Sequence, residues 1–179
     1  MYRIPVLAVV LGLCAAGCGS SSTTTTPTPT TGPSNTPVFT ATILPANEVP
    51  PIVGAESSGS GTATITFHLT RDSTNTITAA TVDFVASMTG FPPGTVVILA
   101  HIHVGAAGVP GGVVINTNIA PGEVTMPNGS GSLVHTDTID STNLATVQAI
   151  INNPAGYYFN IHTPANAGGV ARGQLVAKM

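Results

Sequence analysis

Three histidines are the residues of this chain best placed to do chemistry. His101 and His103 stand two residues apart in the apolar segment 96–104, and His162 stands in a second apolar segment, 157–163. Side chains two apart on a strand leave the same face, with Cα atoms about 6 to 7 Å apart. If the two segments are neighbouring strands, the three imidazoles converge. Neutral imidazoles suit copper or zinc, whereas hard cations prefer carboxylates, so the sequence predicts a Cu or Zn site at His101, His103 and His162.

The same histidines have two other interpretations. They could hydrogen-bond to amide, hydroxyl and backbone groups and pin loops at one end of a β domain, since buried polar groups are normally paired. They could also belong to a metalloenzyme that acts on a small oxidant such as superoxide, which needs an open coordination position and a proton-handling group. We favour a binding module over an enzyme, because for these two requirements the sequence offers only the three histidines and Arg172. A ligating imidazole must be neutral, so we expect metal binding to weaken below about pH 6.

Three further polar residues are candidates for a shell around the ion. Asn160 shares a strand face with His162. Glu48 precedes a Val-Pro-Pro run that imposes extended backbone, and its carboxylate could accept a hydrogen bond from an imidazole N–H or pair with Arg172. We favour a structural role for Glu48 and Arg172, and steering of an anion is the alternative for Arg172.

The composition limits the class of protein that can carry these residues. The chain has 179 residues, 6% of them charged, and its 4 basic and 7 acidic residues give a net charge of −3. A chain this poor in Lys and Arg has no basic patch, so it is not expected to bind nucleic acid. Abundant Thr, β-branched residues and Gly favour short strands and turns over long helices.

Hydrophobic alternation with a period of two runs through the chain from Val38 onward. Along 61–70, apolar side chains fall on one face and Thr side chains on the other, which is typical of a half-buried strand. We expect an all-β fold, an antiparallel Greek-key β-sandwich of about eight strands. The expected strands include 61–70, 80–88, 96–104, 113–116, 131–136, 157–163 and 172–177.

One segment departs from the strand pattern. Leu144, Val147 and Ile151 recur at helical spacing, which predicts a single short helix over 140–151. Asp140 or the following serine can cap its start, and Asn-Asn-Pro at 152–154 can end it.

The first residues predict export and lipid anchoring. An apolar run ends in Ala15-Ala16-Gly17-Cys18, which resembles a bacterial lipobox, and an ordinary signal peptide cleaved nearby is the alternative. We expect residues 1–17 to be a signal peptide, Cys18 to be acylated, and 18–37 to be a Thr-, Pro- and Ser-rich tether. The partner would be membrane lipid, on the periplasmic or cell-surface side and at the outer membrane in a two-membrane bacterium. Residues 38–179 remain for one folded domain.

Four motifs in a fixed order carry a family resemblance. They are NEVPP at 47–51, AHIHVGAAG at 100–108, YFNIHT at 158–163 and GGVARGQL at 168–175. The ordered set resembles the CHRD (chordin-type) domain, which is common in bacterial exported proteins, and the resemblance covers about 38–179. Family members commonly carry Glu where this chain has Val170, so a role that rests on that carboxylate is absent here or moved.

A looser similarity is to the copper–zinc superoxide dismutase sandwich. It is carried by the His-x-His segment and the Gly-containing loop before Arg172. It implies a sandwich and a metal position, and it does not carry the enzyme activity across. Together the residues and the resemblances predict an exported, lipid-anchored binding module with a His-bound Cu or Zn ion. A purely structural surface domain without metal, or one that binds an unknown surface protein, is the remaining alternative.

Overall fold

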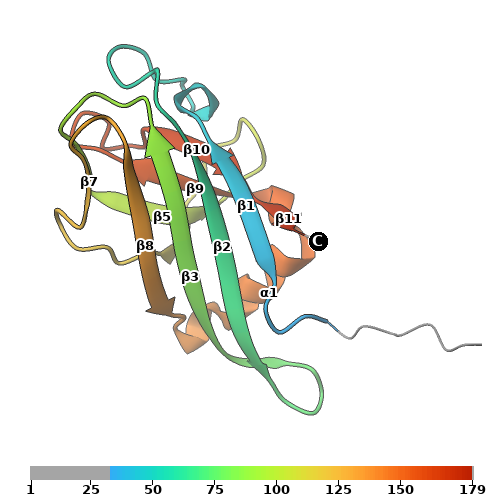
Figure 1. Cartoon of the computed structure of the whole chain (residues 1–179). Helices are drawn as coiled ribbons and strands as arrows, with labels where there is room; N and C mark the ends of the chain where they lie inside the picture. Colours follow the sequence, from blue (N-terminus) through green and yellow to red (C-terminus); the bar gives the residue numbers. More distant parts are fainter. Residues whose placement is uncertain (1–32, 179) are drawn as a thin grey trace, which may run out of the picture. The chain divides into compact units, whose positions relative to one another are not determined.

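A computed structural model describes residues 33–178, and these residues form an antiparallel β-sandwich (Figure 1). The expected signal peptide, Cys18 and most of the tether lie outside the described residues. The strands are β1 (Val38–Ile43), β2 (Ser60–Arg71), β3 (Ile77–Thr89), β4 (Thr95–Val97), β5 (Leu99–Val104), β6 (Val113–Asn116), β7 (Val124–Met126), β8 (Gly131–Thr138), β9 (Tyr157–His162), β10 (Ala171–Gln174) and β11 (Val176–Lys178).

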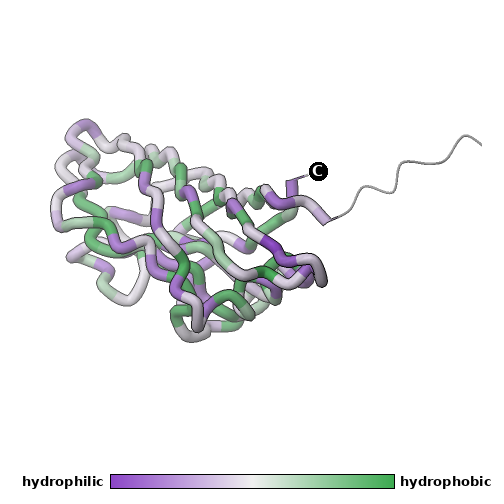
Figure 2. The backbone as a smooth tube through the Cα atoms, turned by 90° about the horizontal axis from the view of Figure 1, so that it is seen from below, coloured by the Kyte–Doolittle hydropathy of each residue, from purple (hydrophilic) through white to green (hydrophobic). Residues whose placement is uncertain are grey.

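The first sheet has five strands in the order β11-β1-β2-β3-β8. Strands β1, β2 and β3 follow one another as antiparallel neighbours, and the later strands β8 and β11 return to flank them, as in Greek-key connectivity. Burial alternates along β2 and β3, because successive side chains point to opposite faces of a strand. Hydrophobic and hydrophilic residues accordingly alternate along the strands in Figure 2. The outward face is rich in Thr.

The second sheet has four strands in the order β10-β9-β5-β6 and lies behind the first in Figure 1. The core fills the space between the two sheets. Across it, the rings of Phe84 on β3 and Phe159 on β9 stack with centroids 6.0 Å apart, and both side chains are almost completely buried. The predicted all-β sandwich is therefore confirmed.

Two expected strands are each divided between different sheets. The segment 96–104 breaks at Ile98 into β4, which pairs with β7, and β5, which belongs to the second sheet. The segment 172–177 breaks at Leu175 into β10 in the second sheet and β11 in the first. Both segments contain continuous apolar runs, in which no change of period marks the crossing point.

The single α-helix of the described residues is α1 (Leu144–Asn152). A 3-10 turn, Ser141–Asn143, precedes it, and the Asp140 carboxylate caps that turn by accepting a hydrogen bond from the Thr142 N–H. The buried face of α1 differs from the predicted one, because Val147 and Ile150 are fully buried whereas Leu144 and Ile151 are half-buried. Two further 3-10 turns, Pro45–Asn47 and Pro154–Gly156, lie in loops. Among the described residues, no helix combines the length and apolarity needed to cross a bilayer.

Candidate metal centre

Strands β5 and β9 are antiparallel neighbours, as the convergence of the three histidines requires. In their register His101 lies opposite Asn160, and Leu99 lies opposite His162. The imidazoles of His101, His103 and His162 therefore leave the outer face of the second sheet, away from the core. Loops cover this face, so each of the three residues is buried, with at most 8% of its surface exposed.

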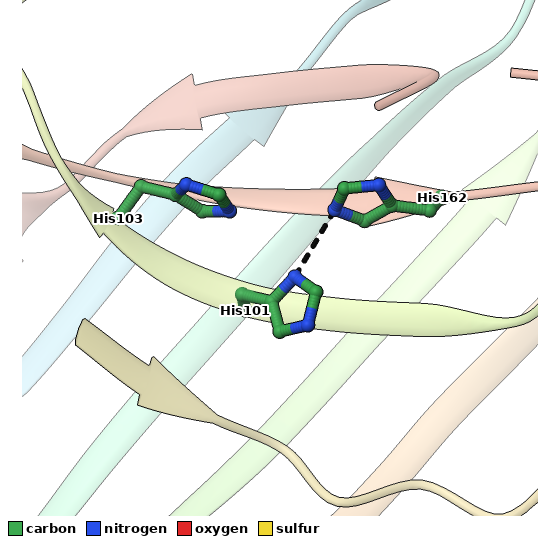
Figure 3. Close-up of side chains that lie close together, drawn as sticks. All are labelled: His101, His103 and His162. Atoms are coloured by element: carbon green, nitrogen blue, oxygen red, sulfur yellow. Dashed lines mark hydrogen bonds between the residues drawn. The ribbon is translucent and has the colours of Figure 1, made fainter. Parts of the chain in front are cut away.

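The three imidazoles form one cluster, seen in Figure 3. Each ring offers a nitrogen, and these three atoms lie within 4.8 Å of one another, so the cluster could hold a metal ion. His101 Nδ1 lies 3.0 Å from His162 Nε2. Bound to one tetrahedral zinc ion, two ring nitrogens would be about 3.3 Å apart. The His101 and His162 nitrogens are thus near the separation of two ligands, whereas separations of up to 4.8 Å in the cluster must shorten before all three nitrogens can reach one ion.

Backbone carbonyls determine which nitrogens face the cluster. His103 Nδ1 lies 2.9 Å from the Gly111 carbonyl oxygen, and His162 Nδ1 lies 2.9 Å from the Ala167 carbonyl oxygen. A carbonyl can only accept, so each Nδ1 carries the proton and donates it. In the neutral rings Nε2 then presents a lone pair. Imidazoles that bind metals are commonly oriented in this way by a bond from their second nitrogen.

Burial keeps two of the rings neutral. It lowers the pKa of His101 to about 4, and the neighbouring His162 and His103 contribute to the shift. Burial also lowers the pKa of His162, although the bond to the Ala167 carbonyl opposes the change. A neutral imidazole is the protonation state that a metal ligand needs.

The three predicted shell residues all lie on or beside the same face. Asn160 is 2% exposed, and its Oδ1 lies 2.9 Å from His162 Nε2. The nearest approach of Arg172 to the Glu48 carboxylate is 3.9 Å. Burial raises the pKa of Glu48, and the charge of Arg172 opposes that rise. Among the described residues no hydrogen bond joins Glu48 to an imidazole, so the observed contact is the predicted pairing with Arg172.

Arg172 is held by structural contacts. Its Nε donates to the Asn47 carbonyl at 2.6 Å, and its guanidinium carbon lies 4.6 Å from the centre of the Tyr158 ring. On its other side, Tyr158 stacks against His103 with ring centroids 4.9 Å apart. Arg172 therefore supports the cluster through Tyr158. With 2% of its surface exposed, it fits the predicted structural role better than steering of an anion.

Several residues of the site were not singled out from the sequence. Tyr158 shares the outer face of β9 with Asn160 and His162. The strand period of two predicts this shared face, because the three residues are spaced two apart. Glu56 accepts hydrogen bonds from Thr163 Oγ1 and Asn166 Nδ2 and so ties down the loop that carries Ala167. That contact joins residues more than one hundred positions apart, and no local pattern indicates it.

Gly169 makes room for the shell. Its φ is +129°, and a Cβ atom there would lie 2.8 Å from Asn160 Nδ2 and 2.9 Å from Glu48 Oε1. Neighbouring Val170 is completely buried in the core. The position at which the CHRD resemblance implies Glu is thus an apolar core position in this chain.

These observations define a class: an antiparallel β-sandwich with a buried three-imidazole cluster on the outer, loop-covered face of one sheet. The family model of the CHRD domain matches residues 39–175. The chain therefore belongs to the CHRD family, which confirms the resemblance inferred from the four motifs. No curated protein and no solved structure matches the chain.

Proposed function

We propose that this protein binds one Cu or Zn ion through His101, His103 and His162. The observation that carries the proposal is His103 Nε2, which is buried and has no hydrogen-bond partner among the described residues. Its Nδ1 is committed to the Gly111 carbonyl, so Nε2 presents an unpaired lone pair. Leaving a buried polar atom unpaired costs about 1–3 kcal/mol, and a cation in the cluster would remove that cost.

The structural-network interpretation leaves this atom unexplained. Within the cluster, one nitrogen–nitrogen contact is short enough for a hydrogen bond, that between His101 and His162. His103 Nδ1 does bond to the Gly111 loop carbonyl, but a purely structural network would also pair its Nε2, because buried polar atoms usually have a partner. The lone pair of His103 Nε2 next to the other two imidazoles supports a metal ligand set.

A competitive titration of the purified full chain tests the proposal. Cu(II) and Zn(II) are titrated against a chelator of known affinity, in parallel for wild type, His101→Ala, His103→Ala and His162→Ala. We expect one ion per chain and an affinity loss of at least about tenfold for each variant. The matched control is His68→Ala. The wild-type His68 side chain pairs with Asp83 on the other sheet, away from the cluster. Equal binding by all five proteins would contradict the proposal.

We further propose that the domain is exported and anchored to a membrane by acylation of Cys18. The Ala-Ala-Gly-Cys run and the polar tether after it support this proposal, since two acyl chains anchor a protein stably where one does not. The test is fractionation of cells that express wild type or Cys18→Ser. We expect intact wild type with membranes and the variant in the soluble fraction, and a membrane-bound intact variant would contradict acylation.

A further inference from the structure

Asn160 makes an unusual contact with the cluster. Its Oδ1 lies 2.9 Å from His162 Nε2. Because His162 Nδ1 donates to the Ala167 carbonyl, Nε2 of the neutral ring is an acceptor, and an amide oxygen can only accept. Two buried acceptors therefore face each other at hydrogen-bond distance with no proton between them. A cation beside both atoms would turn this repulsion into attraction.

Turning the amide over does not remove the conflict. Asn160 Nδ2 and Glu48 Oε1 both border the space left by the absent side chain of Gly169, and the Asn160 amide helps to lower the pKa of Glu48 against the effect of burial. A flipped amide would direct its oxygen at the Glu48 carboxylate, where two acceptors would again meet. In this arrangement Glu48 would keep Asn160 Oδ1 turned toward the imidazoles as a positioning residue.

We infer that Asn160 Oδ1 is a fourth ligand of the proposed ion. This inference rests on the proposed function. Asn160 Oδ1 and His101 Nδ1 lie 2.9 and 3.0 Å from His162 Nε2, which is within the separation possible for two ligands that each lie about 2.0–2.1 Å from one ion. Imidazole ligands suit either Cu(II) or Zn(II), and Cu(II) is the probe because it gives an electron paramagnetic resonance signal.

Electron paramagnetic resonance of the full chain loaded with one equivalent of Cu(II) tests the inference. The variants are Asn160→Ala, which removes the oxygen, and Asn160→Asp, which keeps one. The matched control is Asn116→Ala on β6, since Asn116 lies opposite His101 on the other side of β5. For Asn160→Ala we expect g values and hyperfine splitting that differ from those of wild type, with about tenfold weaker Cu(II) binding. For Asn160→Asp we expect tight binding to be restored. Asn116→Ala should match wild type.

The positioning role of Glu48 has its own pair of variants. Glu48→Leu removes the acceptor and should shift the Cu(II) spectrum in the direction of Asn160→Ala. Glu48→Gln keeps an acceptor oxygen and should retain the wild-type spectrum. Circular dichroism of each metal-free variant reports folding, and a variant that does not fold is replaced in the comparison by its conservative partner.

The outcomes distinguish failure of the proposed function from failure of the fourth ligand. Absence of both Cu(II) and Zn(II) binding by wild type would overturn the proposed function itself. Histidine-dependent binding with identical spectra and affinities for wild type and Asn160→Ala would overturn the fourth ligand alone.

Discussion

Burial of His101 makes the metal-free protein sensitive to acid. The pKa of His101 is about 4 in the folded chain against an ordinary 6.5. Between these two values the unfolded chain binds a proton at His101 that the folded chain does not, so the free energy of unfolding falls as the pH falls through this window. The contribution is fully present above pH 6.5. In metal-free protein, the melting temperature should drop more between about pH 7.5 and about pH 4.5 in wild type than in His101→Asn, and equal drops would contradict this account.

The lowered pKa values also correct an expectation about metal binding. An ordinary imidazole pKa places the loss of binding near pH 6. Because burial lowers the pKa of both His101 and His162, these two ligands stay neutral at lower pH. We therefore expect protons to compete with the ion for His101 and His162 only below about pH 6.

Gly169 is the residue whose replacement should disturb the shell most directly. An added Cβ would approach Asn160 Nδ2 to 2.8 Å, and the φ of +129° is unfavourable for any other residue. We expect Gly169→Ala to lower the free energy of unfolding by about 1–3 kcal/mol. The control is Gly168→Ala, because a Cβ at Gly168 would have no atom within 4 Å. Urea denaturation of both variants measures the difference, and similar stabilities would refute the crowding argument.

At the scale of elements, the contact between β3 and β9 tests where the core lies. Phe84 is 1% exposed and stacks on Phe159 of the opposite sheet. Phe84→Ala should destabilise the domain by about 3–5 kcal/mol, the usual range for a buried aromatic ring. The adjacent Val85 is 45% exposed on the outer face, so Val85→Ala should cost little. Denaturation curves decide the matter, and comparable losses would place Phe84 outside the core.

An element could be predicted from the sequence where hydrophobic and polar residues alternate regularly along it. Strand β2 was predictable from alternation along 61–70, and the shared face of His101 and His103 follows from the same period. The break at Ile98 was not predictable, because the surrounding residues are apolar without alternation. The carbonyls of Gly111 and Ala167 that set the imidazole orientations could not be predicted either, since they depend on loop backbone.

At the scale of the whole molecule, the described domain must be stable without disulfides. The two cysteines of the chain, Cys14 and Cys18, both precede residue 33, so the core between the sheets carries the stability. A chain shortened to residues 33–179 should show a β-rich circular dichroism spectrum and melt at the same temperature as the full chain, with or without reductant. A large fall in melting temperature on shortening would show that the first residues contribute to the fold.

The position of the imidazole cluster on the loop-covered side of a sheet has a kinetic consequence. The core lies on the opposite side of β5 and β9, so opening the loops that contain Gly111 and Ala167 uncovers the cluster while the two sheets stay packed. Such local openings need far less free energy than global unfolding. Uptake and release of an ion would then follow the opening rate of these loops, which hydrogen exchange at their backbone amides reports, and would be independent of the unfolding rate of the domain.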